Sequence, residues 1–221
     1  MDCISYPIDA DLCNLSPAET HYVARMEQTA LLALSAFALV SSITPGPNNM
    51  MLMASGANFG LRRTIPHALG VGFGFTLMIV LVGIGLMGLF DLFPVLNTVL
   101  KIVSVVYLLW LAWKIANAAA PDTESGARGK PMTFVQAMLF QWVNPKAWSM
   151  ALTAIALYAP DRNLGAVLLV AGVFGIINLP STSLWAVMGQ VLRGWLSSPA
   201  RLKAFNWTMA ALLVGSLALL I

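Results

Sequence analysis

The side chains best suited to chemistry lie in two short polar motifs, each placed inside a long apolar run. Residues 44–49 read Thr-Pro-Gly-Pro-Asn-Asn, and residues 144–146 read Asn-Pro-Lys. Proline removes a backbone donor and breaks a helix, which frees carbonyl and amide groups beside these polar side chains. Broken helix ends hold carboxylate and ammonium groups, so the motifs indicate binding of a zwitterionic small molecule. The predicted substrate-binding residues are Thr44, Pro45, Gly46, Pro47, Asn48, Asn49, Gln141, Asn144, Pro145 and Lys146.

Lys146 is the only charged residue well inside any apolar run. A lysine at the centre of a bilayer costs at least about 2.5–3.5 kcal/mol on insertion scales, so it should face the protein interior or an aqueous path. There it could neutralise an anionic group of a substrate, or it could pair with backbone carbonyls for structure. A proline kink is often only a packing device, and it is the matched pair of motifs that favours a binding site.

Other chemistries lack the residues that they need. Two histidines cannot build a metal cluster or a convincing serine–histidine pair, and no nucleotide-binding glycine motif is present. His67 is predicted to lie at the membrane interface, with a proton-carrying role left open. Residues 30–120 contain one acid, Asp91, and residues 126–221 contain only Asp161, so no carboxylate lies at mid-membrane for a proton relay. The sequence predicts no enzyme, no metal and no cofactor.

The composition indicates the elements that must position the two motifs. Of 221 residues, 59% are apolar and 10% are charged, and the mean hydropathy is +0.81. Soluble domains carry about 25% charged residues, so a soluble globule, a nucleic-acid binder and a disordered chain are excluded. Apolar runs of this length cross lipid as helices, because a helix satisfies its own backbone groups. Six runs are predicted to span the membrane: 30–53, 67–90, 95–116, 132–158, 164–190 and 204–221.

The runs divide into two halves around a hydrophilic linker at 119–131. Three spans in each half would insert the second half upside down relative to the first, as in inverted-repeat transporters. The predicted fold is therefore an all-α integral membrane protein with six transmembrane helices arranged as two inverted three-helix repeats, 30–118 and 131–221, in one transporter domain, 30–221. Residues 1–29 form a polar N-terminal tail with five acids and one arginine, or an upstream extension before a start at Met26.

The basic residues predict an orientation. The connections after the first, third and fifth runs, with the adjoining run ends, carry eight of the 12 lysines and arginines, whereas the other side carries three. Basic residues stay on the cytoplasmic side, so both termini are predicted to be periplasmic.

Small and aromatic residues in the runs are interpreted as packing residues. Gly56 with Gly60, and Gly70 with Gly74, have the four-residue spacing of close helix contacts. Trp142 and Trp148 flank the second motif, but six residues apart they do not share one helical face, which favours packing over substrate contact.

Three segments carry a resemblance to a known family: SSITPGPNNMMLMASGANFGLRR at 41–63, YLLWLAWKIA at 107–116 and FQWVNPKAW at 140–148. With them the chain resembles the LysE/RhtB family of amino-acid exporters, from about Met26 to Ile221. The resemblance implies a secondary exporter in the bacterial inner membrane that moves amino acids or related metabolites outward along an ion gradient, with the proton as the expected coupling ion. Threonine, homoserine and cysteine-type substrates look nearer than lysine, and the resemblance favours Met26 as the start.

The alternative function is export or channel conduction of another small solute or ion. A cation channel would prefer rings of acidic residues, which the sequence lacks. The expected partners are an amino acid and the lipid bilayer, with no nucleic acid, and a homo-oligomer is left open.

Overall fold

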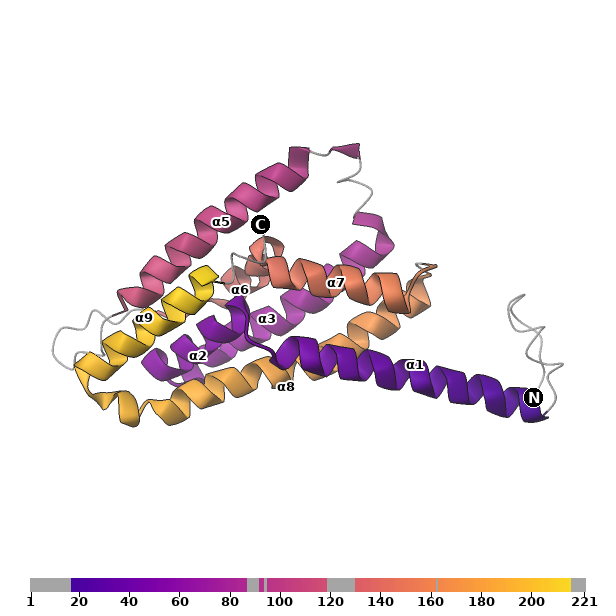
Figure 1. The fold of residues 1–221 in the computed structure, drawn as a ribbon, viewed down its shortest axis with the longest axis horizontal. Helices are drawn as coiled ribbons and strands as arrows, with labels where there is room; N and C mark the ends of the chain where they lie inside the picture. The colour runs from indigo at the N-terminus through magenta and orange to yellow at the C-terminus, as the bar shows by residue number, and fades with distance from the viewer. Residues whose placement is uncertain (1–16, 87–91, 94, 119–129, 162, 216–221) are drawn as a thin grey trace.

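The computed structural model describes residues 17–86, 92–93, 95–118, 130–161 and 163–215, and the described residues contain helices and no strands (Figure 1). This confirms the all-α class. Three short helical turns, η2, η3 and η4, cover Val82–Leu86, Gln141–Val143 and Trp195–Ser197. The longer helices are α1 (Pro17–Ile43), α2 (Pro47–Phe59), α3 (Leu61–Leu81), α5 (Val95–Ala116), α6 (Phe134–Phe140), α7 (Pro145–Tyr158), α8 (Leu164–Leu192) and α9 (Pro199–Gly215).

Length and hydropathy give three or four membrane spans among the described residues. Leu61–Gly85, Thr98–Ala116 and Leu164–Leu192 are each long and apolar enough to cross a bilayer. Glu27–Ile43 and Pro47–Phe59 qualify together as a fourth span that is bent by 54°. Helix α7 has 14 residues and α9, as described, has 17, fewer than the roughly 20 that a span needs. The structure thus supports a multi-pass membrane protein, and six spans in an inverted repeat stay a prediction.

The connection after the first apolar run differs from the prediction. A loop was expected between residues 53 and 67, but α2 continues to Phe59 and α3 begins at Leu61, with only Gly60 between them. Gly60 has φ +83°, a conformation that glycine adopts without strain. The Leu61 backbone N–H donates to Gln190 Oε1 at 2.9 Å, which fixes the turn against α8. The hydropathy pattern did not reveal this tight turn between α2 and α3, because a single glycine rather than a polar loop separates the two helices.

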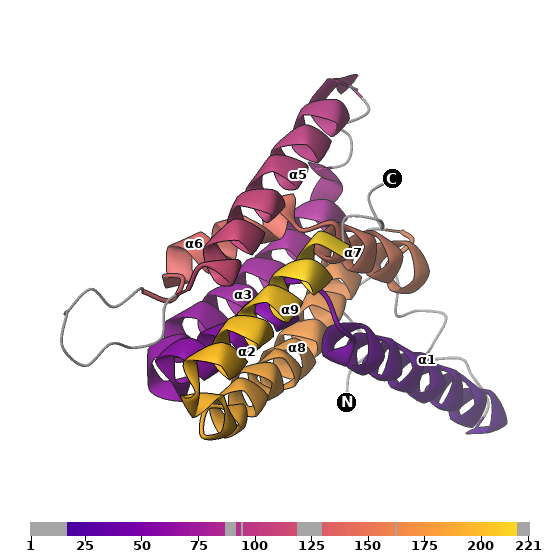
Figure 2. The same ribbon diagram turned by 60° about the vertical axis from the view of Figure 1, so that its left-hand side comes forward.

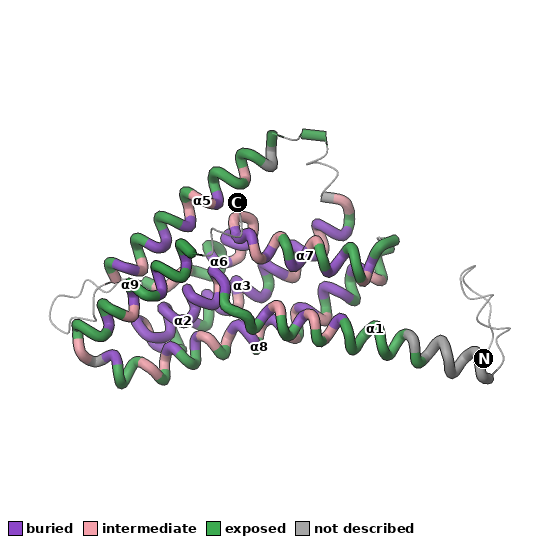
Figure 3. The backbone as a smooth tube through the Cα atoms, in the orientation of Figure 1, coloured by how far each residue is buried: buried purple, intermediate pink, exposed green. Residues whose placement is uncertain are grey.

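Helices α2, α3 and α8 pack against one another (Figures 1 and 2). Helices α5 and α9 pack on each other along one flank, and α1 projects from the opposite end. Residues 17–29, which the sequence assigns to the polar tail, form the first part of α1. Figure 3 shows that α2 is buried while α5 and residues 27–33 of α1 are largely exposed. Their exposed leucines and valines suit contact with lipid chains.

Glycines bring α2 and α8 into direct backbone contact. A Cβ atom on Gly56 would collide with the Ala186 carbonyl, and one on Gly189 would collide with the Met53 carbonyl. Each helix therefore contributes one glycine to the crossing, and the two backbones touch with no side chain between them. This confirms the packing interpretation of Gly56.

Helices α3 and α6 meet in the same way. A Cβ atom on Gly70 would meet the Phe134 backbone, and one on Gly74 would lie 2.7 Å from the Met138 Cα atom. Gly70 and Gly74 are thus packing glycines, as predicted. Their contact holds α6, and with it the start of the second motif, against α3.

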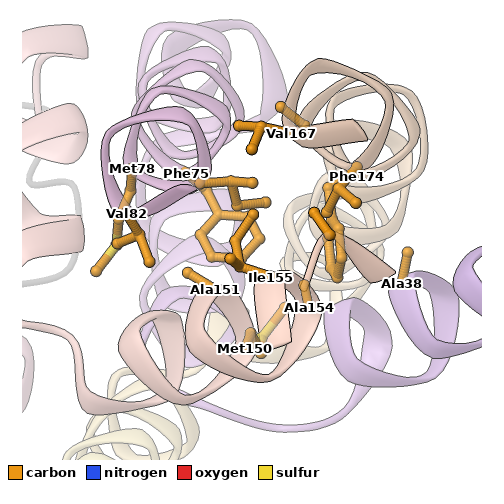
Figure 4. Packing of buried hydrophobic residues seen from close by; sticks show 14 of the residues in the cluster. Ala38, Phe75, Met78, Val82, Met150, Ala151, Ala154, Ile155, Val167 and Phe174 are labelled. Atoms are coloured by element: carbon orange, nitrogen blue, oxygen red, sulfur yellow. The ribbon is translucent and has the colours of Figure 1, made fainter. Parts of the chain in front are cut away.

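A hydrophobic core lies where α1, α3, α7 and α8 meet (Figure 4). The rings of Phe75 and Phe174 make an edge-to-face contact with centroids 5.4 Å apart. On α7, Ala151 and Ala154 are fully buried and allow that helix to approach closely. This packing fixes the start of α7 relative to α3 and α8.

Candidate substrate site at two broken helices

The first break lies between α1 and α2, at residues 44–46. Pro47 occupies the first turn of α2, where its missing N–H costs no hydrogen bond. Gly46 precedes it in an extended conformation, and no side chain caps the N-terminus of α2. Asn49 Nδ2 instead reaches back to the end of α1 and donates to the Ser42 and Thr44 carbonyls, each at 2.8 Å. The break therefore satisfies the end of α1 and leaves the start of α2 open.

The second break lies at Asn144, between η3 and α7. Pro145 begins α7, and Asn144 Oδ1 caps that helix by accepting from the Lys146 backbone N–H at 3.2 Å. The break also brings Trp142 and Trp148 into contact: Trp148 Nε1 donates to the Trp142 carbonyl at 2.9 Å, and the rings lie 5.9 Å apart. Helical spacing predicted separate faces, which was wrong because the chain turns at Asn144. Both tryptophans are partly buried against the core, which agrees with their packing interpretation.

Lys146 joins the two breaks. Its Nζ atom donates to the Thr44 carbonyl at 2.6 Å, to Thr44 Oγ1 at 2.8 Å and to the Pro45 carbonyl at 3.3 Å. These three acceptors match the three N–H groups of an ammonium, and a cation is favoured at a helix C-terminus. Gly46 leaves room for the lysine, since a Cβ atom there would lie 2.6 Å from Lys146 Cδ.

Asn48 and Gln141 form a second bridge between the breaks. Asn48 Nδ2 donates to Gln141 Oε1 at 2.9 Å, and Gln141 Nε2 donates to Asn48 Oδ1 at 3.4 Å and to the Ala137 carbonyl at 2.9 Å. Gln141 is completely buried. With these bonds, all ten residues predicted from the sequence lie at or beside the two breaks.

A cavity lies between the breaks, hereafter the central cavity, and α8 contributes residues to it that the sequence analysis missed. Asn178 Nδ2 donates to Ser42 Oγ at 3.1 Å, and its Oδ1 atom is buried without a partner. Thr182 also lines the cavity. A signal was present in the sequence, because Pro180 lies among polar residues in the middle of the fifth apolar run.

The LysE type translocator family model matches residues 39–221. The chain belongs to this family. Among curated relatives, the cysteine/O-acetylserine efflux proteins of Escherichia coli (strain K12) and Shigella sonnei (strain Ss046) are each 28% identical over 191 residues, which cover 86% of this chain and 96% of each relative. No solved structure matches the chain. This LysE-type translocator is thus a transport protein rather than an enzyme.

The matched region of the LysE-type translocator begins inside α1 and includes both breaks and α8. In the central cavity, the space open to the centre of a water molecule is about 20 Å³, enough for about one or two waters. A free amino acid is larger, so binding one there requires the cavity to widen.

Proposed function

We propose that this LysE-type translocator is a secondary active exporter of amino acids or related metabolites, with its substrate site in the central cavity. The observation that carries the proposal is the contact of Lys146 with Thr44 across two separate helix breaks. This contact places the half-buried ammonium group of Lys146 beside backbone carbonyls at the point where the two breaks meet. A zwitterionic substrate needs both kinds of partner.

The substrate carboxylate would bind Lys146 and the start of α2. Lys146 has its N–H groups on the Thr44 and Pro45 oxygens, and a carboxylate is a stronger acceptor for an ammonium than a carbonyl is. The N-terminus of α2 has no side-chain cap, so its backbone amides favour an anion there. Binding thus exchanges the partners of Lys146 rather than leaving it unpaired.

The substrate ammonium would bind Asn178 of α8, which also lines the central cavity. Asn178 Oδ1 is a buried acceptor without a partner, and a buried acceptor that stays unpaired is unfavourable. An ammonium group of the substrate supplies the missing donor. Asn178 is therefore added to the ten residues predicted from the sequence.

The charges around the central cavity favour small neutral amino acids over lysine as substrates. The described residues that line it include Phe75, Met150 and Ala147 and no acid, so nothing there offsets a second positive charge on the substrate. The relatives are named for efflux of cysteine and O-acetylserine, two molecules with small uncharged side chains. The same class is proposed for this chain.

Location and energy source belong to the proposal as well. The excess of basic residues in the first, third and fifth connections supports an orientation in the bacterial inner membrane with both termini periplasmic. A proton gradient is the proposed driving force. Reporter fusions within 119–131 should be cytoplasmic and fusions after Ile221 periplasmic, and the reverse pattern would contradict this orientation.

Transport by the purified protein tests the function directly. Proteoliposomes loaded with radiolabelled O-acetylserine, cysteine, threonine, homoserine or lysine should release the four neutral substrates faster than protein-free vesicles, and release should respond to an imposed pH gradient. Lysine should remain inside. Release of inorganic ions without release of any amino acid would instead support the alternative, a channel or exporter for another solute.

A further inference from the structure

A second cavity lies between α2, α3 and α5, away from the two breaks. The space open to a water centre there is about 80 Å³, against about 20 Å³ in the central cavity. Ala54, Ser55 and Asn58 line it from one face of α2, and Lys114 lines it from α5. The cavity is lined by these three helices and by non-helical residues at 118 and 130–132, and it is larger than the proposed substrate site.

His67 of α3 lines this second cavity without a hydrogen-bond partner. Its exposed fraction is 1%, and neither Nδ1 nor Nε2 has a partner. The sequence predicted His67 at the membrane interface, but the residue is buried among helices. A neutral imidazole carries one donor and one acceptor, and burying both without partners is unfavourable. A molecule in the second cavity would supply what the ring lacks.

The two uncharged polar side chains of α2 that line the second cavity, Ser55 and Asn58, already have partners. Ser55 and Thr64 hydroxyls lie 2.9 Å apart in a hydrogen bond. Asn58 Nδ2 donates to Asn206 Oδ1 at 2.9 Å. His67 is thus the group among these that remains available to a ligand.

Charge and shape define the ligand class. Lys114 and Lys130 line the second cavity, both are exposed, and no described lining residue is acidic. The remaining wall is mainly apolar, with Met51, Leu111 and Met132 among its residues. Two lysines attract an anion, a histidine N–H can donate to it, and an apolar wall accepts a small side chain.

We propose that the second cavity binds a small-molecule carboxylate and is the site that an exported amino acid occupies before it reaches the central cavity. This proposal rests on the proposed function. In the proposed orientation Lys114 and Lys130 lie on the cytoplasmic side, where an exported substrate arrives. Helix α2 connects the two cavities, since Asn48 near its start lines one and Ser55 lines the other, about 10 Å further along at 1.5 Å per residue.

The imidazole of His67 gives a direct readout. The chain contains two histidines, so full-length protein without a histidine tag, labelled with 15N in histidine only, gives two sets of imidazole signals that His67→Gln assigns. Titration with O-acetyl-L-serine should shift the His67 signals to saturation. Its methyl ester, which lacks the carboxylate charge, should leave them unchanged. Absence of a shift, or an equal shift with the ester, would overturn the proposal.

A charge-removal pair tests the site without altering His67. The double variant Lys114→Met/Lys130→Met should weaken the binding of O-acetyl-L-serine, measured by the same signals, by roughly tenfold. The matched pair Lys101→Met/Lys203→Met removes two exposed lysines that do not line the cavity and should bind like the wild type. If both double variants bind O-acetyl-L-serine equally weakly, the overall charge of the protein explains the effect, and the proposal is overturned.

The Lys146→Met variant separates this inference from the proposed function. Its His67 signals should still shift with O-acetyl-L-serine, because the second cavity does not contain Lys146. Loss of the shift would assign binding to the central cavity and overturn the second site. Efflux from proteoliposomes that contain the wild-type protein tests the exporter function independently. If export fails but the His67 signals still shift, both the exporter function and the role of the second cavity in a transport path are rejected.

Discussion

The two helix breaks use similar residues but expose different groups. At the first break three residues leave the helix, and the Thr44 and Pro45 carbonyls accept hydrogen bonds from the other half of the chain. At the second break only Asn144 leaves the helix, and its own side chain caps α7. The longer break offers backbone acceptors, whereas the shorter break presents the ammonium group of Lys146.

This difference shows how two proline motifs can form one site without being copies of each other. A break that caps itself needs no outside partner, so its nearby side chains are free to reach elsewhere. A break that leaves carbonyls exposed needs donors from outside. Substitutions at the two breaks should therefore have unequal effects on export and stability. The ranking of these effects by size tests the comparison between the breaks.

Removing the ammonium group should have the largest effect. Lys146→Met keeps the length of the side chain but loses all three bonds to the first break, and charge-assisted hydrogen bonds contribute about 1.5–3 kcal/mol each. Export from proteoliposomes should fall by at least about 100-fold, while the amount of inserted protein, measured by gel, stays the same. Lys101→Met is the control and should export normally. Normal export by Lys146→Met would leave the lysine only a structural role at the end of α1.

Asn49→Leu should mainly lower stability. Asn49 is buried and donates to the Ser42 and Thr44 carbonyls. The Thr44 carbonyl keeps its bond from Lys146, but the leucine leaves the buried Ser42 carbonyl without this donor. The free energy of unfolding should fall by about 2 kcal/mol, which a thermal melt in detergent monitored by tryptophan fluorescence would detect. Asn117→Leu removes an exposed hydrogen bond from the Asn117 side chain to the Trp113 carbonyl at the end of α5. This variant should change the melting temperature far less. Equal losses would mean that Asn49 is not needed to close the end of α1.

The bridge between the breaks should give a smaller, coupled effect. Asn48→Leu and Gln141→Leu each remove the 2.9 Å bond between the two side chains and should raise the substrate concentration for half-maximal export. The double variant should be less impaired than the sum of the two, with a coupling of about 1 kcal/mol. Additive effects would show that the two amides act independently.

The smallest effect is expected at the self-capped break. Asn144→Ala removes the cap of α7 and should cost about 1 kcal/mol of stability, measured by the same melt. Asn144→Ser keeps a capping oxygen and should remain within about 0.5 kcal/mol of the wild type. If the serine variant loses export while it remains stable, Asn144 contacts the substrate as well as capping the helix.

The sequence predicted the breaks well because proline and glycine act locally. Pro47 and Pro145 each begin a helix after a break, and polar residues of both breaks line the central cavity; their role in substrate binding stays a prediction. The role of Asn178 was missed because its contact with Ser42 joins helices 136 residues apart. Such a pairing depends on how α1 and α8 cross, which no local pattern contains.

Helix boundaries were predicted less accurately, for physical reasons. The last apolar run was placed from residue 204, but α9 begins at Pro199. Proline is favoured at the first turn of a helix. The hydropathy pattern left this first turn out of the predicted run because the start of α9 contains the charged residues Arg201 and Lys203. Charged residues at a helix end hide the start of that helix from an analysis that counts apolar residues.

The glycine contact between α2 and α8 has a consequence for movement during transport. Backbones that touch at Gly56 and Gly189 have no side chains between them that could change rotamer, so we expect the two helices to move as a rigid body. Opening of the central cavity then falls to the neighbouring segments, and residues 44–46, outside any helix, form the natural hinge. On this view α1 swings relative to an α2–α8 unit that stays fixed while the translocator changes the side of the membrane to which it opens.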